Sequence, residues 1–277
     1  MRERLRVIGA ETVAIVEAGW YTAPDGRRIE IAEQVRQAVA GTVLYGPEPV
    51  EIVPPPPEPV AGRIEVTGES SFDAARRLLA AGSGPVAVLN FASALWPGGG
   101  FLDGARAQEE SLCRASALYA CLVGFDDYYR PHLERGDDLY TDRVLHSPGV
   151  PVFRDDGWNL LPEPVAVGVL TAAAPNLRSI PRDEPHLLPL VPQVFRDRGR
   201  QVLAVAARHG YRRLVLGAWG CGAFRNDPAV VADAFAGLLA PGGPFARHFD
   251  EVVFAVLTQY PSESLTARVF ARALGVG

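Results

Sequence analysis

From Gly62 onward, short apolar runs of strand length alternate with amphipathic helical patterns, and this alternation is the feature that most constrains the fold. Continuous apolar runs predict strands, and apolar residues at i, i+3 and i+4 spacing predict helices. The predicted strands are 63–67, 86–91, 143–153, 165–172, 213–217 and 252–258. The predicted helices are 72–81, 108–122, 188–209, 228–239 and 264–274. This order predicts an α/β fold, a sandwich around a mixed and largely parallel sheet.

Residues 1–59 lack this alternation and are typical of a mainly helical accessory segment. Helical spacing covers 4–18 and 31–39, with a turn at Asp25-Gly26 between them. The proline run at 54–59 then predicts a stiff, extended connector, and less readily a proline-rich ligand for a partner module. We therefore expect two units, the N-terminal segment 1–59 and a main domain 60–277.

Charge and residue usage exclude several classes of function. The net charge is −5, so we expect no specific binding to nucleic acid and no attachment to anionic membranes, which both need a basic surface. All 27 basic residues are arginines, most simply through coding bias, and this excludes a phosphate-binding lysine or a Schiff base. Cys113, Cys121 and Cys221 form no CxxC pair and no cluster with histidine, so we expect no metal site and a reducing, cytoplasmic location.

The stretch 86–122 combines three features of a ligand site. Its apolar strand runs into a loop with three glycines at 98–100, where the backbone can approach a ligand because no side chain intervenes. The helix expected from residue 108 then carries Glu109 and Glu110 in its first turn. Together these features predict a small-ligand site at the end of the sheet. The alternative is that the two glutamates only cap the helix, since acidic first turns are common.

A second glycine-rich loop, at 217–226, also follows a predicted strand and precedes a predicted helix. Consecutive backbone N–H groups in such a turn form an anion cradle, and ligands of open α/β sheets lie beyond the carboxyl ends of strands. Alone, this loop is equally well explained as a tight structural turn. Two glycine loops in the same strand–loop–helix context favour a phosphate or diphosphate ligand.

These residues resemble those of the bacterial-type poly(ADP-ribose) glycohydrolases, a catalytic branch of the macrodomain superfamily. Three glycines, seven further residues and then Gln-Glu-Glu at 108–110 match the GGG…QEE signature of that family. The run Asn-Phe-Ala-Ser at 90–93 lies where macrodomains carry Asn-Ala-Ala-Asn, and because Ser93 replaces the second Asn we assign it no ribose contact. The resemblance implies a macrodomain-like three-layer α/β/α sandwich with a mixed sheet for 60–277.

The resemblance also implies site roles and partners. Glu110 is expected to be the catalytic general acid and base, and Glu109 is expected to hold ribose hydroxyls. The other substrate-binding residues that it implies are Asn90, Gly98, Gly99, Gly100, Gln108, Gly220, Cys221, Gly222, Ala223 and Phe224. The second loop would wrap the diphosphate, and the turn at 67–69 is the expected adenine contact. The implied partners are poly(ADP-ribose), ADP-ribose and ADP-ribosylated proteins, with no cofactor.

Glycosidic cleavage is compatible with two neighbouring carboxyls. The oxocarbenium-like transition state needs a proton for the leaving oxygen and negative charge near the sugar. Residues 109 and 110 diverge by roughly 100° on a helix, so they flank a sugar from one side only. This fits one acid/base and one positioning group, with the substrate diphosphate supplying the charge. A helix start favours the ionised carboxylate. Desolvation, the second carboxyl and the diphosphate favour the protonated form, and we expect these three effects to outweigh the helix start once substrate binds.

Two other functions would share this fold and both loops. A non-catalytic ADP-ribose reader needs no acid against the glycosidic bond, so the Gln-Glu-Glu run argues against it. An enzyme that removes single ADP-ribose units from proteins is the other alternative. Trp96 and Trp219 are equally expected to line the pocket or to anchor their loops, while the three cysteines are expected to pack rather than react.

Overall fold

The computed structural model describes residues 1–57, 62–82, 84–258 and 264–276. Its strands are β1 (Trp20–Thr22), β2 (Arg28–Glu30), β3 (Val43–Tyr45), β4 (Arg63–Thr67), β5 (Val86–Ala92), β6 (Val144–Arg154), β7 (Leu160–Ala173), β8 (Arg213–Gly217) and β9 (Glu251–Ala255). Its α-helices are α1 (Arg2–Ala18), α2 (Ala32–Ala40), α3 (Ser71–Ala81), α4 (Gln108–Ala115), α5 (Leu118–Leu122), α6 (Asp126–Arg135), α7 (Ile180–Asp183), α8 (Val191–Arg208), α9 (Pro228–Leu239) and α10 (Leu265–Leu274). Two short 3₁₀ helices are η1 (Phe101–Asp103) and η2 (Pro185–Leu190).

The central sheet has seven strands in the order β3-β6-β7-β5-β8-β9-β4. The five strands from β7 to β4 run parallel to one another, because every neighbouring pair among them is parallel. β6 is antiparallel to β7, and β3 is antiparallel to β6. The prediction of a mixed, largely parallel sheet is therefore confirmed.

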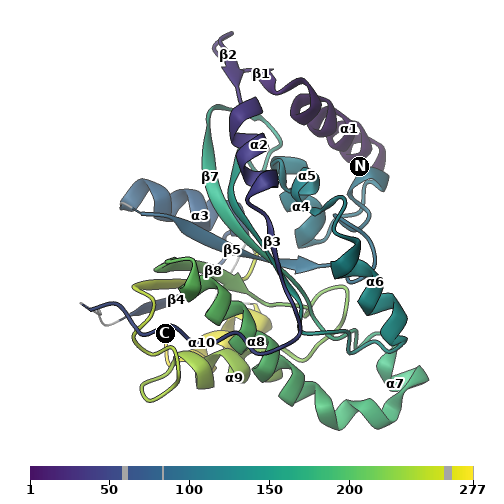
Figure 1. Ribbon diagram of the computed structural model, residues 1–277, viewed down its shortest axis with the longest axis vertical. Coiled ribbons are helices and arrows are strands. Elements are labelled where there is room, and N and C mark those ends of the chain that lie inside the picture. Colours follow the sequence, from purple (N-terminus) through teal and green to yellow (C-terminus); the bar gives the residue numbers. More distant parts are fainter. Residues whose placement is uncertain (58–61, 83, 259–263, 277) are drawn as a thin grey trace.

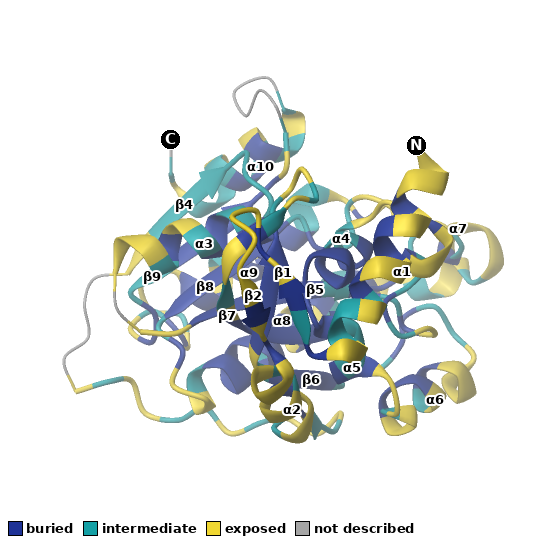
Figure 2. Ribbon diagram, turned by 90° about the horizontal axis from the view of Figure 1, so that it is seen from above, coloured by how far each residue is buried: buried dark blue, intermediate teal, exposed yellow. Residues whose placement is uncertain are grey.

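Side chains of the central strands alternate between two apolar cores, one on each face of the sheet. On β5, Val86 and Val88 pack with α2, α3, α4 and α5, whereas Ala87 and Leu89 pack with α8, α9 and α10. Figure 1 shows α8, α9 and α10 grouped on one side of the sheet, away from α2, α4 and α5. Figure 2 shows the buried strands between helices whose outer surfaces are exposed. The three-layer α/β/α sandwich is confirmed.

The segment expected as an accessory unit contributes directly to this sandwich. Its two predicted helices are present as α1 and α2, but β3 also adds an edge strand to the main sheet. From α1, the hydroxyl of Thr12 donates to the backbone oxygen of Arg114 on α4 at 2.7 Å. The predicted boundary near residue 59 falls on 58–61, outside the described residues, and stays a prediction.

The single helix predicted at 108–122 is wrong, because the chain interrupts it to pair with β6. Ser116 forms an antiparallel bridge with Val152, and the N–H of Ala117 donates to the backbone oxygen of Pro151 at 3.1 Å. These contacts separate α4 from α5.

Other elements also differ from the sequence prediction: β1, β2 and α7 were not predicted, and β7 begins at Leu160 rather than at 165. The helix predicted at 188–209 starts as the proline-containing η2 before α8 begins. The final strand is shorter than 252–258, since β9 ends at Ala255. The helix α6, with Pro131 inside it, was not predicted. Across the described ranges, no helix is long and apolar enough to span a membrane.

Candidate active site

The two glycine loops lie side by side because they follow adjacent parallel strands, β5 and β8. The chain leaves β5 for α4, which packs in the core on one face of the sheet, and leaves β8 for α9, which packs on the other face. Open α/β sheets bind ligands outside the carboxyl ends of neighbouring strands whose connections diverge in this way. Each loop also contributes a residue to one small apolar cluster, in which Phe224 packs against the group formed by Ala94, Tyr140 and Ala173.

Glu109 and Glu110 turn inward from the first turn of α4 and are 3% and 8% exposed. Oε2 of Glu109 accepts from the N–H of Ser93 at 2.7 Å, and its Oε1 accepts from Nδ2 of Asn90 at 3.3 Å. Oε1 of Glu110 accepts from the N–H of Gly100 at 3.1 Å. Both carboxyls are thus bound by amides outside α4, which favours a role in a site over the capping alternative.

The two carboxyl oxygens of Glu110 differ in their surroundings. Oε2 is buried, yet it has no hydrogen-bond partner among the residues that the structure describes. A buried carboxyl oxygen without a partner is uncommon because its desolvation is uncompensated. The site therefore presents one anchored and one free oxygen of the same carboxyl.

Gly99 marks the point where the two carboxyls converge. A Cβ at this position would come 2.5 Å from Oε1 of Glu110 and 3.2 Å from Oε2 of Glu109. Gly99 also has φ +56°, a conformation that side chains rarely adopt. The neighbouring glutamates are thus directed to one side of the same small volume.

Burial raises the pKa of Glu109 from 4.5 to about 8, and the neighbouring Glu110 adds to the rise. Hydrogen bonds from the Ser93 N–H and the Asn90 amide oppose it. A carboxyl with this pKa is largely protonated at neutral pH and can then donate as well as accept a hydrogen bond.

The amide of Gln108 is bound entirely to the protein's own groups. Its Nε2 donates to Oγ of Ser71 at 3.0 Å and to the backbone oxygen of Leu89 at 2.8 Å, and its Oε1 accepts from the N–H of Phe91 at 2.9 Å. Gln108 therefore ties the start of α4 to the end of β5. Its predicted contact with substrate stays a prediction.

Asn90 orients Glu109 from the adjacent strand. It is fully buried on β5, and besides Glu109 its Nδ2 donates to Oγ1 of Thr171 on β7 at 3.2 Å. Its Oδ1 has no partner within the described ranges. Thr171 was not among the predicted site residues.

The three glycines of the first loop face different surroundings. A Cβ on Gly98 would meet the side chains of Phe101, Tyr119 and Cys113, which belong to the core. A Cβ on Gly100 would meet only Ala105, and its N–H is the one that binds Glu110. Ligand contacts predicted for Gly98 and Gly100 are untested.

In the second loop, Gly220 is closely packed against neighbouring residues, whereas Gly222 has open space where a side chain would lie. A Cβ on Gly220 would come 2.5 Å from Nδ2 of Asn226, whereas nothing lies within 4 Å of one on Gly222. The buried Asn226 donates to the backbone oxygens of Gly220 at 3.0 Å and Pro175 at 2.8 Å. Asn226 was missed by sequence reasoning; an asparagine next to the helix-starting Asp-Pro is the signal that was present.

The other residues predicted in this loop have distinct positions. Ala223 is exposed, and the ring of Phe224 lies 6.3 Å from that of Tyr140, a residue that sequence reasoning missed. Burial raises the pKa of Cys221 to about 12, so its thiol is protonated at neutral pH. Trp219 is fully buried and donates to the backbone oxygen of Ala172 at 3.1 Å, which identifies it as an anchor rather than a pocket wall.

The turn at 67–69, predicted to contact adenine, follows β4 at the far edge of the sheet. In this turn, Oε1 of Glu69 forms an ion pair with Nε of Arg77 at 2.8 Å. Since β9 separates β4 from β8, this turn lies apart from the two glycine loops. The adenine contact remains a prediction.

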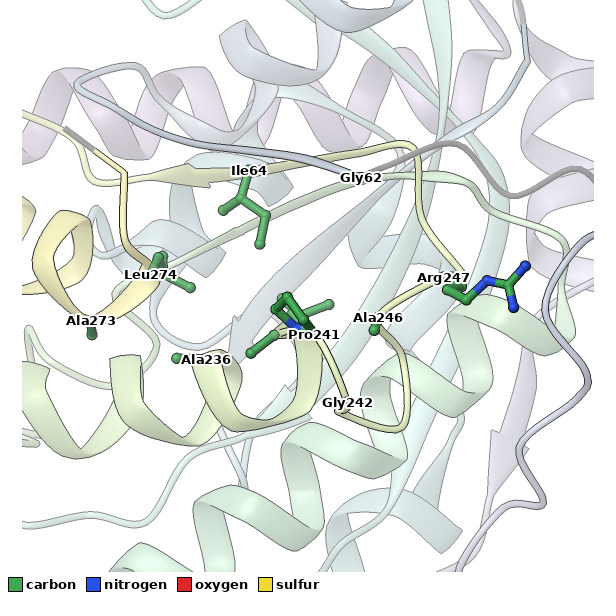
Figure 3. Close-up of a pocket in the computed structure, with 11 residues that line it drawn as sticks. Gly62, Ile64, Ala236, Pro241, Gly242, Ala246, Arg247, Ala273 and Leu274 are labelled. Carbon is green, nitrogen blue, oxygen red and sulfur yellow. The ribbon is translucent and has the colours of Figure 1, made fainter.

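The groove in Figure 3 is a separate feature. It lies among β4, α9 and α10 and is lined by Ile64, Ala236, Pro241 and Leu274 among others. It includes none of the predicted site residues. No group of three or more His, Cys, Asp and Glu side chains suited to a metal ion occurs in the described part of the chain.

Comparison with known proteins gives a consistent result. The family described as microbial-type PARG, catalytic domain, matches residues 9–155, whereas no curated protein matches the chain. The crystal structure of poly(ADP-ribose) glycohydrolase (PARG) from Thermomonospora curvata has a TM-score of 0.91 and 51% identity, covering 98% of this chain and 99% of that one. The same enzyme bound to the inhibitor ADP-HPD has a TM-score of 0.88 and 51% identity over the same shares.

A more distant relative is the PARG of Deinococcus radiodurans in complex with ADP-ribose. Its TM-score is 0.78 at 42% identity, covering 87% of this chain and 96% of that one. The family match spans both the glycine loop and the two glutamates. This chain belongs to the microbial-type poly(ADP-ribose) glycohydrolase family.

Proposed function

We propose that this chain is a poly(ADP-ribose) glycohydrolase that cleaves the ribose–ribose bond of its polymer and releases ADP-ribose. The observation that carries the proposal is the carboxyl of Glu110, anchored through Oε1 by the Gly100 N–H and free at Oε2. A general acid needs this arrangement, because one oxygen fixes the group while the other faces the reacting atom. The relatives that bind ADP-ribose and ADP-HPD support the same ligand class.

The proton moves through Glu110 in both half-reactions. As the bond between the anomeric carbon and the bridging oxygen breaks, protonated Glu110 gives its proton to the departing ribose oxygen, and the bond electrons leave with that oxygen. The resulting oxocarbenium-like sugar is attacked by water, and the Glu110 carboxylate takes the water's proton. The enzyme is then restored with its original proton count.

Glu109 positions the sugar rather than cycling a proton. Its carboxyl is clamped by Ser93 and Asn90, and its raised pKa gives it a proton to donate. It therefore suits paired ribose hydroxyls, which accept as well as donate. Both carboxyls lie next to Gly99, so they can contact one sugar from the same side.

The second loop supplies the diphosphate site through its backbone. Gly222 is exposed and unobstructed, while Asn226 fixes the turn by holding the oxygen of Gly220. Backbone N–H groups of such a turn bind phosphate oxygens without a lysine, which this chain lacks. Phe224 then packs against the ribose next to the diphosphate.

The proposal includes protein-linked polymer as substrate and a cytoplasmic location. The three cysteines are free thiols, two of them buried, which agrees with a reducing compartment. No metal or cofactor takes part in the proposed steps.

The experiment is an assay of ADP-ribose release by the full chain from free poly(ADP-ribose) and from mono-ADP-ribosylated protein. We expect release from the polymer and little from the mono-modified protein. Binding of ADP-ribose with no release from either substrate would identify a reader. Release from the mono-modified protein alone would identify a mono-ADP-ribosyl hydrolase.

A further inference from the structure

Trp96 differs from the other three tryptophans because its indole has no partner among the residues that the structure describes. Trp20 lies under the guanidinium of Arg28, and Trp158 lies under that of Arg114. Trp219 is buried against the ring of Phe195. The indole of Trp96 is 69% exposed, and within the described ranges it makes no hydrogen bond, ring contact or cation contact.

The backbone that carries this indole is nevertheless held firmly. The N–H of Trp96 donates to Oγ of Ser93 at 3.1 Å, and its backbone oxygen accepts from the N–H of Gly99 at 3.0 Å. The N–H of the same Ser93 binds Glu109. An exposed aromatic side chain on a fixed turn forms a platform whose point of attachment is set before any ligand arrives.

The platform stands close to the catalytic carboxyl. The hydrogen bond between positions 96 and 99 closes a four-residue turn, which brings their Cα atoms within about 7 Å. Gly99 in turn lies against Glu110. Trp96 and the carboxyl of Glu110 therefore both lie close to Gly99.

The chemistry of the polymer places a purine in this position. Under the proposed function, on which this inference rests, Glu110 protonates the 2′-oxygen of a ribose that carries adenine on its neighbouring carbon. That ribose and its base belong to the next unit of the chain, not to the terminal ADP-ribose in the site. The base therefore lies only a few bonds from the protonated oxygen.

We propose that Trp96 stacks against the adenine of the leaving ADP-ribose unit and forms a subsite for polymer that free ADP-ribose does not occupy. Every nucleobase has an apolar face, and an exposed indole binds such a face without hydrogen bonds. Trp96 thereby favours substrates that continue beyond the terminal unit.

The first test compares Trp96→Ala with wild type at subsaturating polymer. We expect kcat/KM to fall roughly 5- to 100-fold, the range that one base–aromatic stack contributes. The Kd for ADP-ribose and the thermal midpoint should stay at wild-type values, and Trp96→Phe should recover most of the loss. Leu265→Ala is the matched control, because Leu265 is also 69% exposed but lies on α10. This control should behave as wild type.

The second test observes the stack itself. In a Glu110→Gln background, which prevents consumption of the ligand, an ADP-ribose oligomer should quench the emission of Trp96 and ADP-ribose should not. Adding Trp96→Phe should abolish the quenching by oligomer.

The outcomes separate this inference from the proposed function. If wild type releases no ADP-ribose from polymer, the proposed function fails. If wild type is active and Trp96→Ala keeps its kcat/KM, the subsite is overturned. If Trp96→Ala loses ADP-ribose affinity by as much as it loses kcat/KM on polymer, Trp96 only supports the loop. If its kcat/KM falls only on protein-linked substrates, Trp96 contacts the modified protein. Both outcomes contradict the stack.

Discussion

The backbone of Gly99 lies against the carboxyl of Glu110, so closely that a Cβ at position 99 would come 2.5 Å from Oε1. That oxygen is the one anchored by the N–H of the next residue, Gly100. The glycine loop thus has a purpose besides admitting a ligand: it leaves the space that the carboxyl occupies. The φ of +56° at Gly99 serves the same end, since it turns the peptide so that the following N–H meets the carboxyl.

Gly99→Ala should therefore impair the carboxyl of Glu110, which is proposed to be catalytic, more than it impairs the fold. The added methyl displaces the Glu110 side chain, and misplacement of a catalytic group by about 1 Å can cost about 10²-fold in rate. The left-handed backbone adds a destabilisation of about 1–2 kcal/mol. Steady-state kinetics on polymer and denaturant unfolding measure the two effects. A variant with wild-type kcat would show that the carboxyl does not depend on this contact.

Gly222→Val should weaken ligand binding and leave the stability of the fold almost unchanged. Nothing lies within 4 Å of a Cβ at this exposed position, so the free energy of unfolding should change by less than about 0.5 kcal/mol. The added side chain would stand where the diphosphate is proposed to bind, and the Kd for ADP-ribose should rise at least ~10-fold. Calorimetric titration measures this change. Unchanged affinity would show that the loop is a structural turn only.

The main layers of this fold were predictable because both faces of the central strands are buried. Val86 to Leu89 is continuously apolar for this reason, and the same holds for β8 and β9. β3 was not predictable, since three residues carry too little pattern and only pairing with β6 makes them a strand. The interruption between α4 and α5 at Ser116 likewise depends on a β-bridge to Val152, which cannot be predicted from the neighbouring sequence.

The site was predictable at the level of its motifs but not of its contacts. The glycine loop and the paired glutamates stand out in the sequence, and the structure brings them together. The direction of each glycine depends on tertiary packing: Gly98 faces Phe101 and Tyr119, while the adjacent Gly99 faces the carboxyls. The anchoring of the second loop by Asn226 joins groups 51 residues apart along the chain, at Pro175, and is equally invisible locally.

The raised pKa of Glu109 predicts a specific dependence of stability on pH. Between 4.5 and about 8 the unfolded chain has released this proton and the folded chain retains it, so this group's contribution to stability is complete at low pH. It is lost as pH rises through that window, with a slope of at most about 1.4 kcal/mol per pH unit. Glu109→Gln cannot titrate. Its stability relative to wild type should therefore improve from pH 5 to pH 8 in urea unfolding, and a constant difference would refute the raised pKa.

Activity should be independent of divalent ions. The proposed steps use a carboxyl, backbone N–H groups and the substrate's own charge, and the described residues contain no cluster of metal-ligating side chains. Dialysis against chelator should leave the rate of polymer hydrolysis unchanged. Loss of activity that is restored by a divalent ion would contradict the proposed mechanism.

The two neighbouring glutamates should respond differently to the same substitution. Glu110→Gln keeps the size of the side chain and an oxygen for the Gly100 N–H, but it cannot transfer a proton, so kcat should fall by ~10²–10⁴. The Kd for ADP-ribose should change little, because the lost interaction belongs to the transition state. Glu109→Gln can keep only one of the two hydrogen bonds that the carboxyl accepts from Ser93 and Asn90, because an amide has a single acceptor oxygen. Since the proposed task of Glu109 is to hold ribose hydroxyls, a larger share of the loss in kcat/KM should appear as an increased KM.

The comparison of these two variants decides between catalysis and helix capping. A capping role would give two similar stability defects of well under ~2 kcal/mol and leave turnover intact. Polymer-hydrolysis kinetics and unfolding of both variants, measured together, distinguish the cases. Among the described residues of the site, only the carboxyl of Glu110 has one oxygen held by a backbone N–H and one oxygen without a partner. Wild-type turnover in Glu110→Gln would therefore leave the proposed mechanism without a general acid.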